Sequence, residues 1–306
     1  MNSWQRRNIL KKLRRTGIHD NHPVGYLFIA PSILGITLFY LVPALMSLVM
    51  MFTDYSFMSK GDIQFIGLDN FKRLAGDASF HNSVLMTLIF LLTVPVSLIV
   101  AFPIAYILNQ SVYWTKLLRT LFFLPYIMNG VAIAFVWMLL FHPSMGPING
   151  ALKMIGIGSP PGWLSGTDTA IYAVCIIQIW IMVGYNMIIY LASLQEVPKE
   201  LLEAATIDGA RLWHSIRYIT VPLVSPTTFL LLITGFISAI KTFGIIQATT
   251  AGGPGEATNV LSLYIYKTAF RYYEMGYASA ISWMLFAIIM LVMLLNWAGQ
   301  RRWVHY

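Results

Sequence analysis

Six long runs of residues without a single charge are the feature that most restricts how this chain of 306 residues can fold. Each run is longer than twenty residues, and together they cover 21–53, 78–115, 120–152, 169–195, 218–240 and 275–300. About twenty apolar residues in a helix, at about 1.5 Å each, cross a hydrocarbon core about 30 Å thick. Lipid tolerates only helices and closed barrels, and uninterrupted apolar runs of this length exclude the alternating strands of a barrel. The sequence therefore predicts an all-α membrane protein with six spans, at about 25–51, 83–108, 120–141, 170–193, 226–249 and 277–299.

Composition supports a membrane location, because only 10% of the residues are charged, against roughly 25% in a soluble domain. Five prolines fall inside or at the edges of the predicted spans, namely Pro31, Pro43, Pro95, Pro103 and Pro125. Proline lacks a backbone N–H, and its ring displaces the carbonyl four residues earlier, so we expect kinks in these spans. Kinks are tolerated where neighbouring helices or a water-filled cavity satisfy the freed carbonyls.

The positions of lysine and arginine predict the orientation of the spans. Thirteen of these residues lie in the N-terminal tail, the loops after spans two and four, and the C-terminal tail, whereas six lie in the loops on the other side. By the positive-inside rule, both termini and the loop after span four are predicted to be cytoplasmic. The chain then divides into a basic cytoplasmic segment at 1–24, a transmembrane domain at 25–299 that includes a cytoplasmic loop at 195–225, and a cytoplasmic tail at 300–306.

The basic N-terminal segment accounts for much of the net charge of +8, and this topology explains that charge without nucleic acid. Ile9, Leu10 and Leu13 stand between its cations. The segment acts either as a topology anchor or as a helix that lies on the anionic inner leaflet. The apolar stretch that follows is too long for a signal peptide, so we expect it to stay in the mature protein.

Residues that carry catalytic chemistry are missing from the sequence. It has neither a G-x-x-x-x-G-K-[ST] phosphate loop nor an H-E-x-x-H zinc motif, and its six histidines are scattered through tails and loops. Proton relays and intramembrane proteolysis need buried carboxylates, and the six charge-free runs contain none. We therefore expect no catalytic residue, metal or cofactor on this chain, so another chain must supply the energy unless the protein is a passive channel. Lys241, the one charged residue inside a predicted span, either extends to the interface or lines a polar pathway.

A half-polar insert of about thirty residues separates spans four and five. Pro198 suits the first turn of a helix here, and Gly209 suits the left-handed position that ends one. A second short helix is predicted at about 210–219, and it should end before Pro222. This helix–turn–helix is too small to bury its own apolar face. It is either a connector that rests on lipid headgroups or a docking element for another protein.

The insert resembles the EAA loop in the permease subunits of binding-protein-dependent ABC importers. That pattern is E-A-A, three residues, glycine, nine residues, then I-x-L-P, and Val221 replaces the usual leucine here. In this family the loop sits in a cleft of the cytoplasmic ATPase subunit, and a carboxylate at the Glu203 position faces basic residues. The resemblance implies that coupling to the ATPase is carried by Glu203, Ala204, Ala205, Asp208, Gly209, Ile219 and Pro222.

Three further stretches, 65–84, 117–149 and 249–282, are similar to permeases of the maltose and glycerol-3-phosphate type. The T-x-G-G-P sequence at 250–254 is similar to that of the first of the two non-identical permeases such systems pair, and Gly-Gly-Pro is expected to form a tight turn. The resemblance implies a type I ABC importer permease fold in a bacterial or archaeal cell membrane. It also implies several partners: a second homologous permease, two copies of an ATPase subunit that bind ATP and Mg²⁺, an extracytoplasmic sugar-binding protein, and membrane lipid.

The same resemblance implies a substrate pathway midway through the membrane. The matching residues are Tyr126, Asn129, Gly130, Tyr185, Asn186, Ser238, Ala239 and Thr242, with Lys241 nearby. Aromatic rings stack on sugars, and amides and hydroxyls bind sugar hydroxyls; the alternative role for each tyrosine or asparagine is a hydrogen bond between helices. Because Gly130, Ala239 and Lys241 differ from the maltose-type residues, maltose itself is not favoured. The permease class favours a di- or oligosaccharide, with a sugar phosphate or polyol as the alternative.

Two other classes of function compete with an importer subunit. An autonomous channel or facilitator would need no partner for the cytoplasmic loop. A membrane enzyme would need a buried catalytic cluster, which the sequence lacks. The sequence therefore predicts the permease subunit of an ATP-driven sugar importer.

Overall fold

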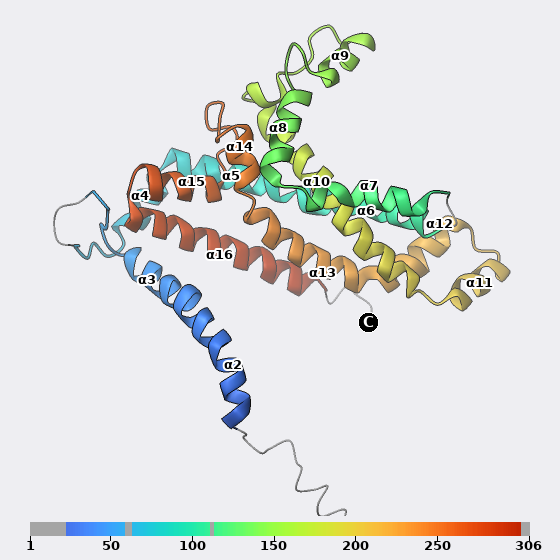
Figure 1. Cartoon of the computed structure of the whole chain (residues 1–306), viewed down its shortest axis with the longest axis horizontal. Helices are drawn as coiled ribbons and strands as arrows, with labels where there is room; N and C mark the ends of the chain where they lie inside the picture. Colours follow the sequence, from blue (N-terminus) through green and yellow to red (C-terminus); the bar gives the residue numbers. More distant parts are fainter. Residues whose placement is uncertain (1–22, 59–62, 111–112, 301–306) are drawn as a thin grey trace, which may run out of the picture. The chain divides into compact units, whose positions relative to one another are not determined.

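The computed structural model of the chain describes residues 23–58, 63–110 and 113–300. Predictions for the basic N-terminal tail and the last six residues lie outside the described residues. The described part is built from helices (Figure 1), and one isolated bridge between Thr53 and Phe65 is its only pairing of extended backbone. The all-α prediction is thus confirmed for this part of the chain. The chain forms two units, Met1–Met50 and Met51–Tyr306, which are described separately.

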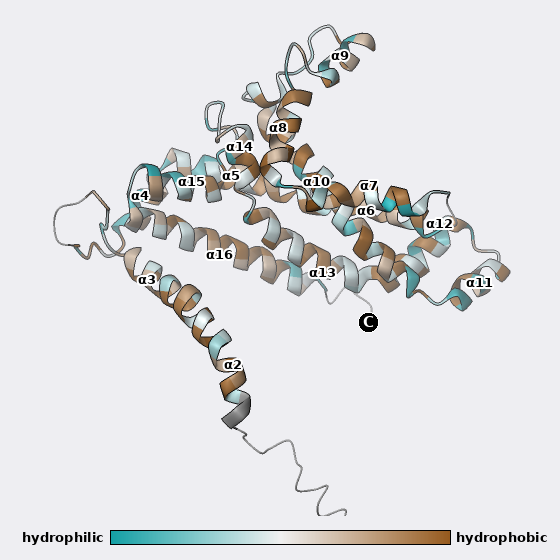
Figure 2. Ribbon diagram, viewed as in Figure 1, coloured by the Kyte–Doolittle hydropathy of each residue, from teal (hydrophilic) through white to brown (hydrophobic). Residues whose placement is uncertain are grey.

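The first unit holds one long apolar helix at the position of the first predicted span. It consists of α2 (Pro23–Ile36), a π-helical turn (Thr37–Leu41) and α3 (Val42–Met50). In the π turn the N–H of Val42 donates to the carbonyl of Thr37, five residues back. This wider turn comes just before Pro43, whose ring would clash with the carbonyl four residues earlier in a regular helix. Hydrophobic residues recur along this helix (Figure 2), as expected for a segment in hydrocarbon.

In the second unit, long apolar helices cover the second, fourth and sixth predicted spans. These helices are α5 (Ala78–Leu91) with α6 (Thr93–Asn109), α10 (Ala170–Gln195) and α16 (Met275–Gln300). A break at Leu92 separates α5 from α6, close to Pro95. α10 packs along α6 through a buried cluster that includes Ala101, Met187 and Tyr190. α7 (Thr115–Ile127) and α13 (Val221–Ile240) pack against this pair.

The third predicted span is not one straight helix. It is divided into α7 (Thr115–Ile127) and α8 (Gly130–Leu140), which meet at an angle of 104°. Asn129 has extended backbone angles, and its Oδ1 accepts the N–H of Val131 at 2.8 Å, which caps the start of α8. Pro125 removes one N–H from the last turn of α7, so a new helix can begin here at little cost. Each half, at about 17–20 Å, is shorter than a hydrocarbon core of about 30 Å.

The helix at the fifth predicted span, 226–249, has different bounds from those of the predicted span. One continuous helix runs through α12 (Leu212–Ser215), a π-helical turn η3 (Ile216–Thr220) and α13 (Val221–Ile240). The helix therefore does not stop before Pro222, because the π turn, in which Val221 N–H donates to Ile216 O, gives the proline ring room. Lys241 caps the C-terminal end of α13 instead of lying inside a span, and α14 (Gly244–Thr249) follows separately.

Shorter helices lie between the long ones. They are α4 (Asp69–Gly76), α9 (Pro147–Met154), a 3-10 turn (Trp163–Ser165), α11 (Lys199–Ile207), and α15 (Leu261–Tyr266) with a π-helical turn (Lys267–Arg271). By length and apolar composition, the described residues hold five helices able to cross a membrane, or six if the bent α7–α8 pair is one span. The chain is therefore a multi-pass helical membrane protein.

Candidate functional site

The predicted coupling loop forms a helix–turn–helix, and its second helix, α12, is the start of the long helix Leu212–Ile240. α11 ends at Gly209, which has a φ of +79°. The N–H of Ala210 donates to the carbonyl of Ala205 at 2.9 Å, and the N–H of Gly209 donates to that of Thr206 at 3.1 Å. This pair of bonds is the Schellman arrangement, so the predicted left-handed helix end at Gly209 is confirmed. The chain then turns directly into α12.

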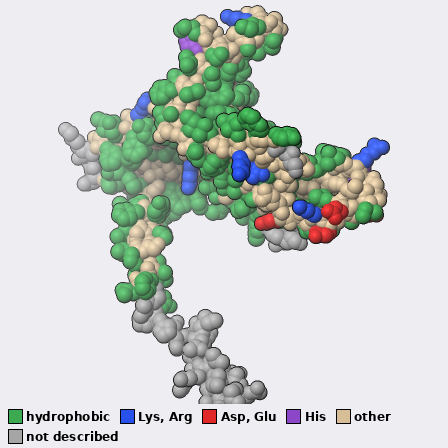
Figure 3. All heavy atoms as spheres, turned by 45° about the vertical axis from the view of Figure 1, so that its right-hand side comes forward, with side chains coloured by type: hydrophobic (Ala, Val, Ile, Leu, Met, Phe, Trp, Pro, Cys, Tyr) green, Lys and Arg blue, Asp and Glu red, His purple; other side chains and the backbone are tan. Residues whose placement is uncertain are grey.

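The side chains of this loop are largely exposed. Glu203, Ala204 and Asp208 are exposed, whereas Ile219 and Pro222 are half-buried where the loop joins α13. Charges of both signs are among the exposed side chains of the molecule (Figure 3). On the loop these are Lys199, Glu200, Glu203, Asp208 and Arg211. Large apolar side chains are exposed beside them, among them Ile207 at 86% and Trp213 at 67%. A mixed apolar and charged surface on a small rigid element is suited to binding another protein.

Two of the predicted pathway residues stack on one another. The rings of Tyr126 on α7 and Tyr185 on α10 lie 4.7 Å apart, inclined at 22°. Phe123 extends this group, with its ring 5.7 Å from that of Tyr126. Tyr126 keeps 46% of its surface exposed. The structure therefore presents an accessible aromatic face just before the bend between α7 and α8.

The bend itself is built by the next two predicted residues. Asn129 uses its side chain to cap α8, so its amide oxygen is engaged with the backbone. Gly130 lies against α14, where an added Cβ would come within 3.3 Å of Ile245 Cγ1. A small residue at this position lets α8 and α14 approach closely.

The remaining predicted pathway residues make local or buried contacts. Asn186, 2% exposed, donates from Nδ2 to Ser97 Oγ at 2.9 Å, which is the interhelical hydrogen bond expected as its alternative role. Ala239, also 2% exposed, packs in the core. Ser238 and Lys241 are exposed at the end of α13, and Thr242 Oγ1 donates to the Ser238 carbonyl at 3.0 Å. Contact with a solute stays a prediction for all of these residues.

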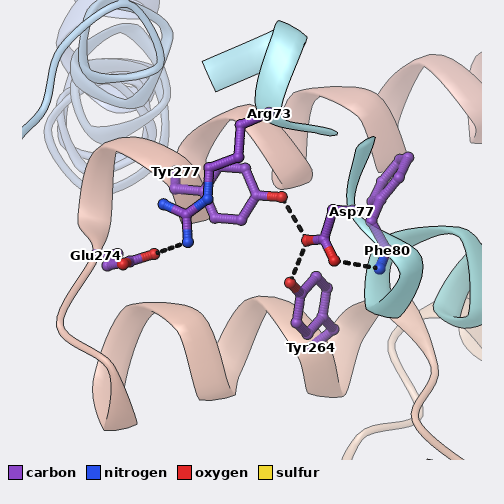
Figure 4. Close-up of polar contacts among 6 residues, drawn as sticks. All are labelled: Arg73, Asp77, Phe80, Tyr264, Glu274 and Tyr277. Atoms are coloured by element: carbon purple, nitrogen blue, oxygen red, sulfur yellow. Dashed lines mark hydrogen bonds and ion pairs between the residues drawn. The ribbon is translucent and has the colours of Figure 1, made fainter. Parts of the chain in front are cut away.

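A carboxylate cluster that sequence reasoning missed ties three segments together (Figure 4). Asp77 caps α5 by accepting the N–H of Ser79 at 2.9 Å, and its other oxygen accepts the hydroxyls of Tyr264 and Tyr277, each at 2.5 Å. Arg73 lies 3.9 Å from the ring of Tyr277 and forms an ion pair with Glu274 at 2.8 Å. An aspartate just before an apolar run is a recognisable helix-cap signal. No local sequence pattern connects Asp77 to Tyr264 and Tyr277, which follow it by 187 and 200 residues.

The environment of Asp77 changes its acidity. Burial would raise the pKa of the carboxyl, but the hydrogen bonds from Tyr264, Tyr277 and the helix N-terminus outweigh it and lower the pKa below 3.8. The same contact acts in the opposite sense on Tyr264, whose pKa is raised by burial and by the neighbouring carboxylate. Asp77 is therefore ionised, and Tyr264 neutral, through the physiological pH range.

The Gly-Gly-Pro segment forms the tight turn that was predicted. Gly253 N–H donates to Thr250 O at 2.9 Å, and Gly252 has a φ of +92°. A side chain at Gly252 would also meet Lys267 Nζ at 2.5 Å from its Cβ. The loop is fastened to α5, since Asn82 Nδ2 donates to the backbone carbonyl of Glu256 at 2.9 Å.

Comparison with known proteins gives a consistent result. Residues 93–303 match the family described as "Binding-protein-dependent transport system inner membrane component". The chain is 37% identical to a probable ABC transporter permease protein of Bacillus subtilis (strain 168), over 97% of this chain and 96% of that protein. It is 33% identical to a probable starch degradation products transport system permease protein of Thermoanaerobacterium thermosulfurigenes, over 87% and 90% of the two chains.

A third relative and a solved structure complete the comparison. The chain is 34% identical to the sn-glycerol-3-phosphate transport system permease protein of Agrobacterium fabrum (strain C58 / ATCC 33970), over 94% of this chain and 98% of that protein. The fold is similar to that of a chain in a bacterial alginate ABC transporter, solved in complex with an alginate pentasaccharide-bound periplasmic protein. That likeness has a TM-score of 0.79 at 23% identity and covers 91% of this chain and 94% of the other.

Proposed function

The chain belongs to the family of inner membrane components of binding-protein-dependent transport systems, and we propose that it is the permease subunit of an ATP-driven sugar importer. Members of this family are transport components of the membrane. The proposal adds three things to family membership: a separate ATPase that supplies the energy, the α11–α12 loop as the contact with that ATPase, and a sugar as the solute.

The observation that carries the proposal is the exposed helix–turn–helix of α11 and α12. It bears exposed charged and apolar side chains, and it is continuous with a membrane helix. Leu212–Ile240 is one helix of 29 residues, about 44 Å long. A push on α12 from an ATPase subunit is therefore transmitted directly along α13 into the bundle. ATP and Mg²⁺ bind to the ATPase subunits, and no cofactor is assigned to this chain.

In the proposed arrangement both termini and the coupling loop face the cytoplasm, as the positive-inside rule predicts. A second, homologous permease completes the pathway, two ATPase copies close on ATP, and an extracytoplasmic binding protein delivers the solute. Closing the ATPase pair opens a central cavity outward, and hydrolysis returns it to the inward-facing state.

A sugar is the solute that the aromatic pair favours. Tyr126 and Tyr185 offer a flat apolar face of the kind on which a pyranose ring stacks. The names of the relatives support this choice, since they include transport of starch degradation products and of lactose. One relative is named for sn-glycerol-3-phosphate, so a sugar phosphate is the second candidate.

A charge reversal at Glu203 tests the proposal. Glu203→Lys should reduce sugar-stimulated ATPase activity and uptake at least about tenfold, because a like-charge contact at an interface costs several kcal/mol. The chain should still insert and purify with the second permease, since Glu203 is exposed. Glu200→Lys, on the same helix, serves as the matched control and should have a smaller effect. Undiminished coupling in Glu203→Lys would contradict the assigned contact.

A further inference from the structure

We propose that an anionic phospholipid binds in a groove beside the continuous helix that carries the second half of the coupling loop. This groove, here called the α6–α13 groove, has a volume of about 560 Å³. One wall is α6, with Leu98 and Phe102 among its residues, and the other runs from Trp213 to Leu232 along α12, η3 and α13. The proposal concerns lipid and does not depend on which solute is transported.

The lining of the α6–α13 groove is suited to an acyl chain. Its polar groups are the indole N–H of Trp213 and the hydroxyls of Tyr106, Tyr190 and Thr228. Tyr190 OH donates to Thr228 Oγ1 at 3.0 Å, and Thr228 Oγ1 donates to the Val224 carbonyl at 3.3 Å, so these hydroxyls are engaged with each other and with the backbone. A sugar entering this groove would lose its hydrogen bonds to water and find little in return. An acyl chain has no hydrogen bonds to water that it could lose on entering the groove.

The length of the groove also fits a lipid tail. Its α6 wall extends from Pro95 to Ile107, which is about 18 Å of helix. One leaflet contributes half of a hydrocarbon core about 30 Å thick, or about 15 Å. A single acyl chain of the leaflet can therefore lie along most of the groove.

One end of the groove carries a cation. A second cavity, of about 240 Å³, shares Trp213, Ile216 and Val221 with the groove and adds Arg217 and Tyr218. Within the part of the chain that the structure describes, Arg217 forms no ion pair; its guanidinium lies 5.8 Å from the ring centre of Tyr218. An exposed cation flanked by aromatic rings, next to an apolar groove, matches the headgroup and the acyl chain of an anionic phospholipid.

The positive charge of Arg217 favours an anionic lipid over an apolar protein helix as the occupant of the groove. A partner helix could fill the groove, but it would leave Arg217 without an anion. The proposed orientation, on which this step rests, places Arg217 at the cytoplasmic leaflet, where anionic lipids lie. A lipid held there would contact both α6 and the helix that leads from the coupling loop into the membrane.

Quenching of Trp213 fluorescence tests the proposal. The full chain, with the subunits that co-purify with it, is placed in nanodiscs that contain phosphatidylglycerol or phosphatidylcholine, each with brominated acyl chains. Subtracting the signal of the Trp213→Phe variant isolates Trp213 from the other tryptophans. The mole fraction of brominated lipid that gives half-maximal quenching should be about fivefold lower for phosphatidylglycerol than for phosphatidylcholine. One cation near the membrane surface favours an anionic lipid by about that factor.

Two charge variants decide whether the preference belongs to this site. Arg217→Gln should abolish the preference for phosphatidylglycerol, whereas Arg211→Gln, an exposed cation that lines neither cavity, should keep it. Equal loss in both variants would mean general electrostatic attraction and would overturn the proposal. Equal quenching by both lipids, or none by either because another subunit covers the groove, would overturn it as well. Each of these outcomes leaves the assignment of the ATPase contact untouched.

Discussion

At the scale of single residues, Asp77 joins segments that are far apart in the sequence. Its carboxylate accepts hydrogen bonds from the first turn of α5, from Tyr264 and from Tyr277. Tyr264 lies in α15 and Tyr277 in α16. The Asp77 side chain therefore links the start of α5 to both α15 and α16. Removing its charge should therefore loosen this whole region rather than one helix end.

We expect Asp77→Asn to destabilise the protein by about 1–3 kcal/mol, the usual cost of leaving buried donors poorly paired. A thermal unfolding measurement in detergent checks this. Asp69→Asn is the control, because its ion pair with Lys72 is exposed and should contribute little. Equal melting temperatures for Asp77→Asn and the unaltered protein would contradict the role of the cluster.

The pH dependence follows from the lowered pKa of Asp77. A carboxyl whose pKa is lower in the folded state contributes stability above its unfolded value, near 3.8, and that stability is lost as pH falls through the lower folded value. The melting temperature of the unaltered protein should therefore fall more steeply below about pH 4 than that of Asp77→Asn.

Tyr185 permits a sharp test of the aromatic pair. Tyr185→Ala should reduce sugar uptake at low solute concentration by about two- to tenfold, since aromatic contacts are worth about 0.5–1.5 kcal/mol beyond their area. Tyr185→Phe keeps the ring and should retain most uptake. The comparison separates stacking from a hydroxyl contact, and equal losses in the two variants would argue against stacking on this face.

At the scale of elements, the positions of the apolar helices could be predicted because hydrophobicity is a local property of the sequence. The ends of these helices and the bends within them could not be predicted in this way. α7 and α8 separate where a side-chain cap at Asn129 competes with continuation of the helix, and the fifth-span helix continues past Pro222 because a π turn accommodates the ring. A second π turn, at Thr37–Leu41, precedes Pro43 in the first span in the same way.

The turn of the coupling loop was predictable because it depends on one residue. Gly209 has a positive φ, and an added Cβ there would meet no atom within 4 Å. Within this chain, a side chain at Gly209 is therefore opposed by the backbone conformation and not by a clash. Gly209→Val should lower coupled ATPase activity several-fold, because the left-handed backbone costs a β-branched residue about 1–3 kcal/mol.

Gly209→Asn is the matched control, since asparagine tolerates this backbone conformation and should preserve most of the activity. ATPase assays of the purified complex measure both variants. If valine and asparagine behaved alike, the left-handed turn would not be what coupling requires.

At the scale of the whole molecule, the family and fold could be anticipated from the spacing of Glu203, Gly209 and Pro222 together with the apolar spans. The candidate site was predictable only in part. Tyr126 and Tyr185 do meet, but Asn186 and Ala239 are buried in helix packing, and the Asp77 cluster connects residues that no local pattern relates. Contacts between distant segments are set by the packing of the bundle, which sequence periodicity does not specify.

Uptake into liposomes is the measurement that tests the central claim most directly. The tagged full chain is purified with its co-purifying subunits, reconstituted, and supplied with labelled sugar and the cognate binding protein outside. The account predicts uptake only when ATP and Mg²⁺ are present on the side of the ATPase, and recovery of an ATPase subunit with the chain. Recovery of this chain alone, active in sugar transport without ATP, would contradict it.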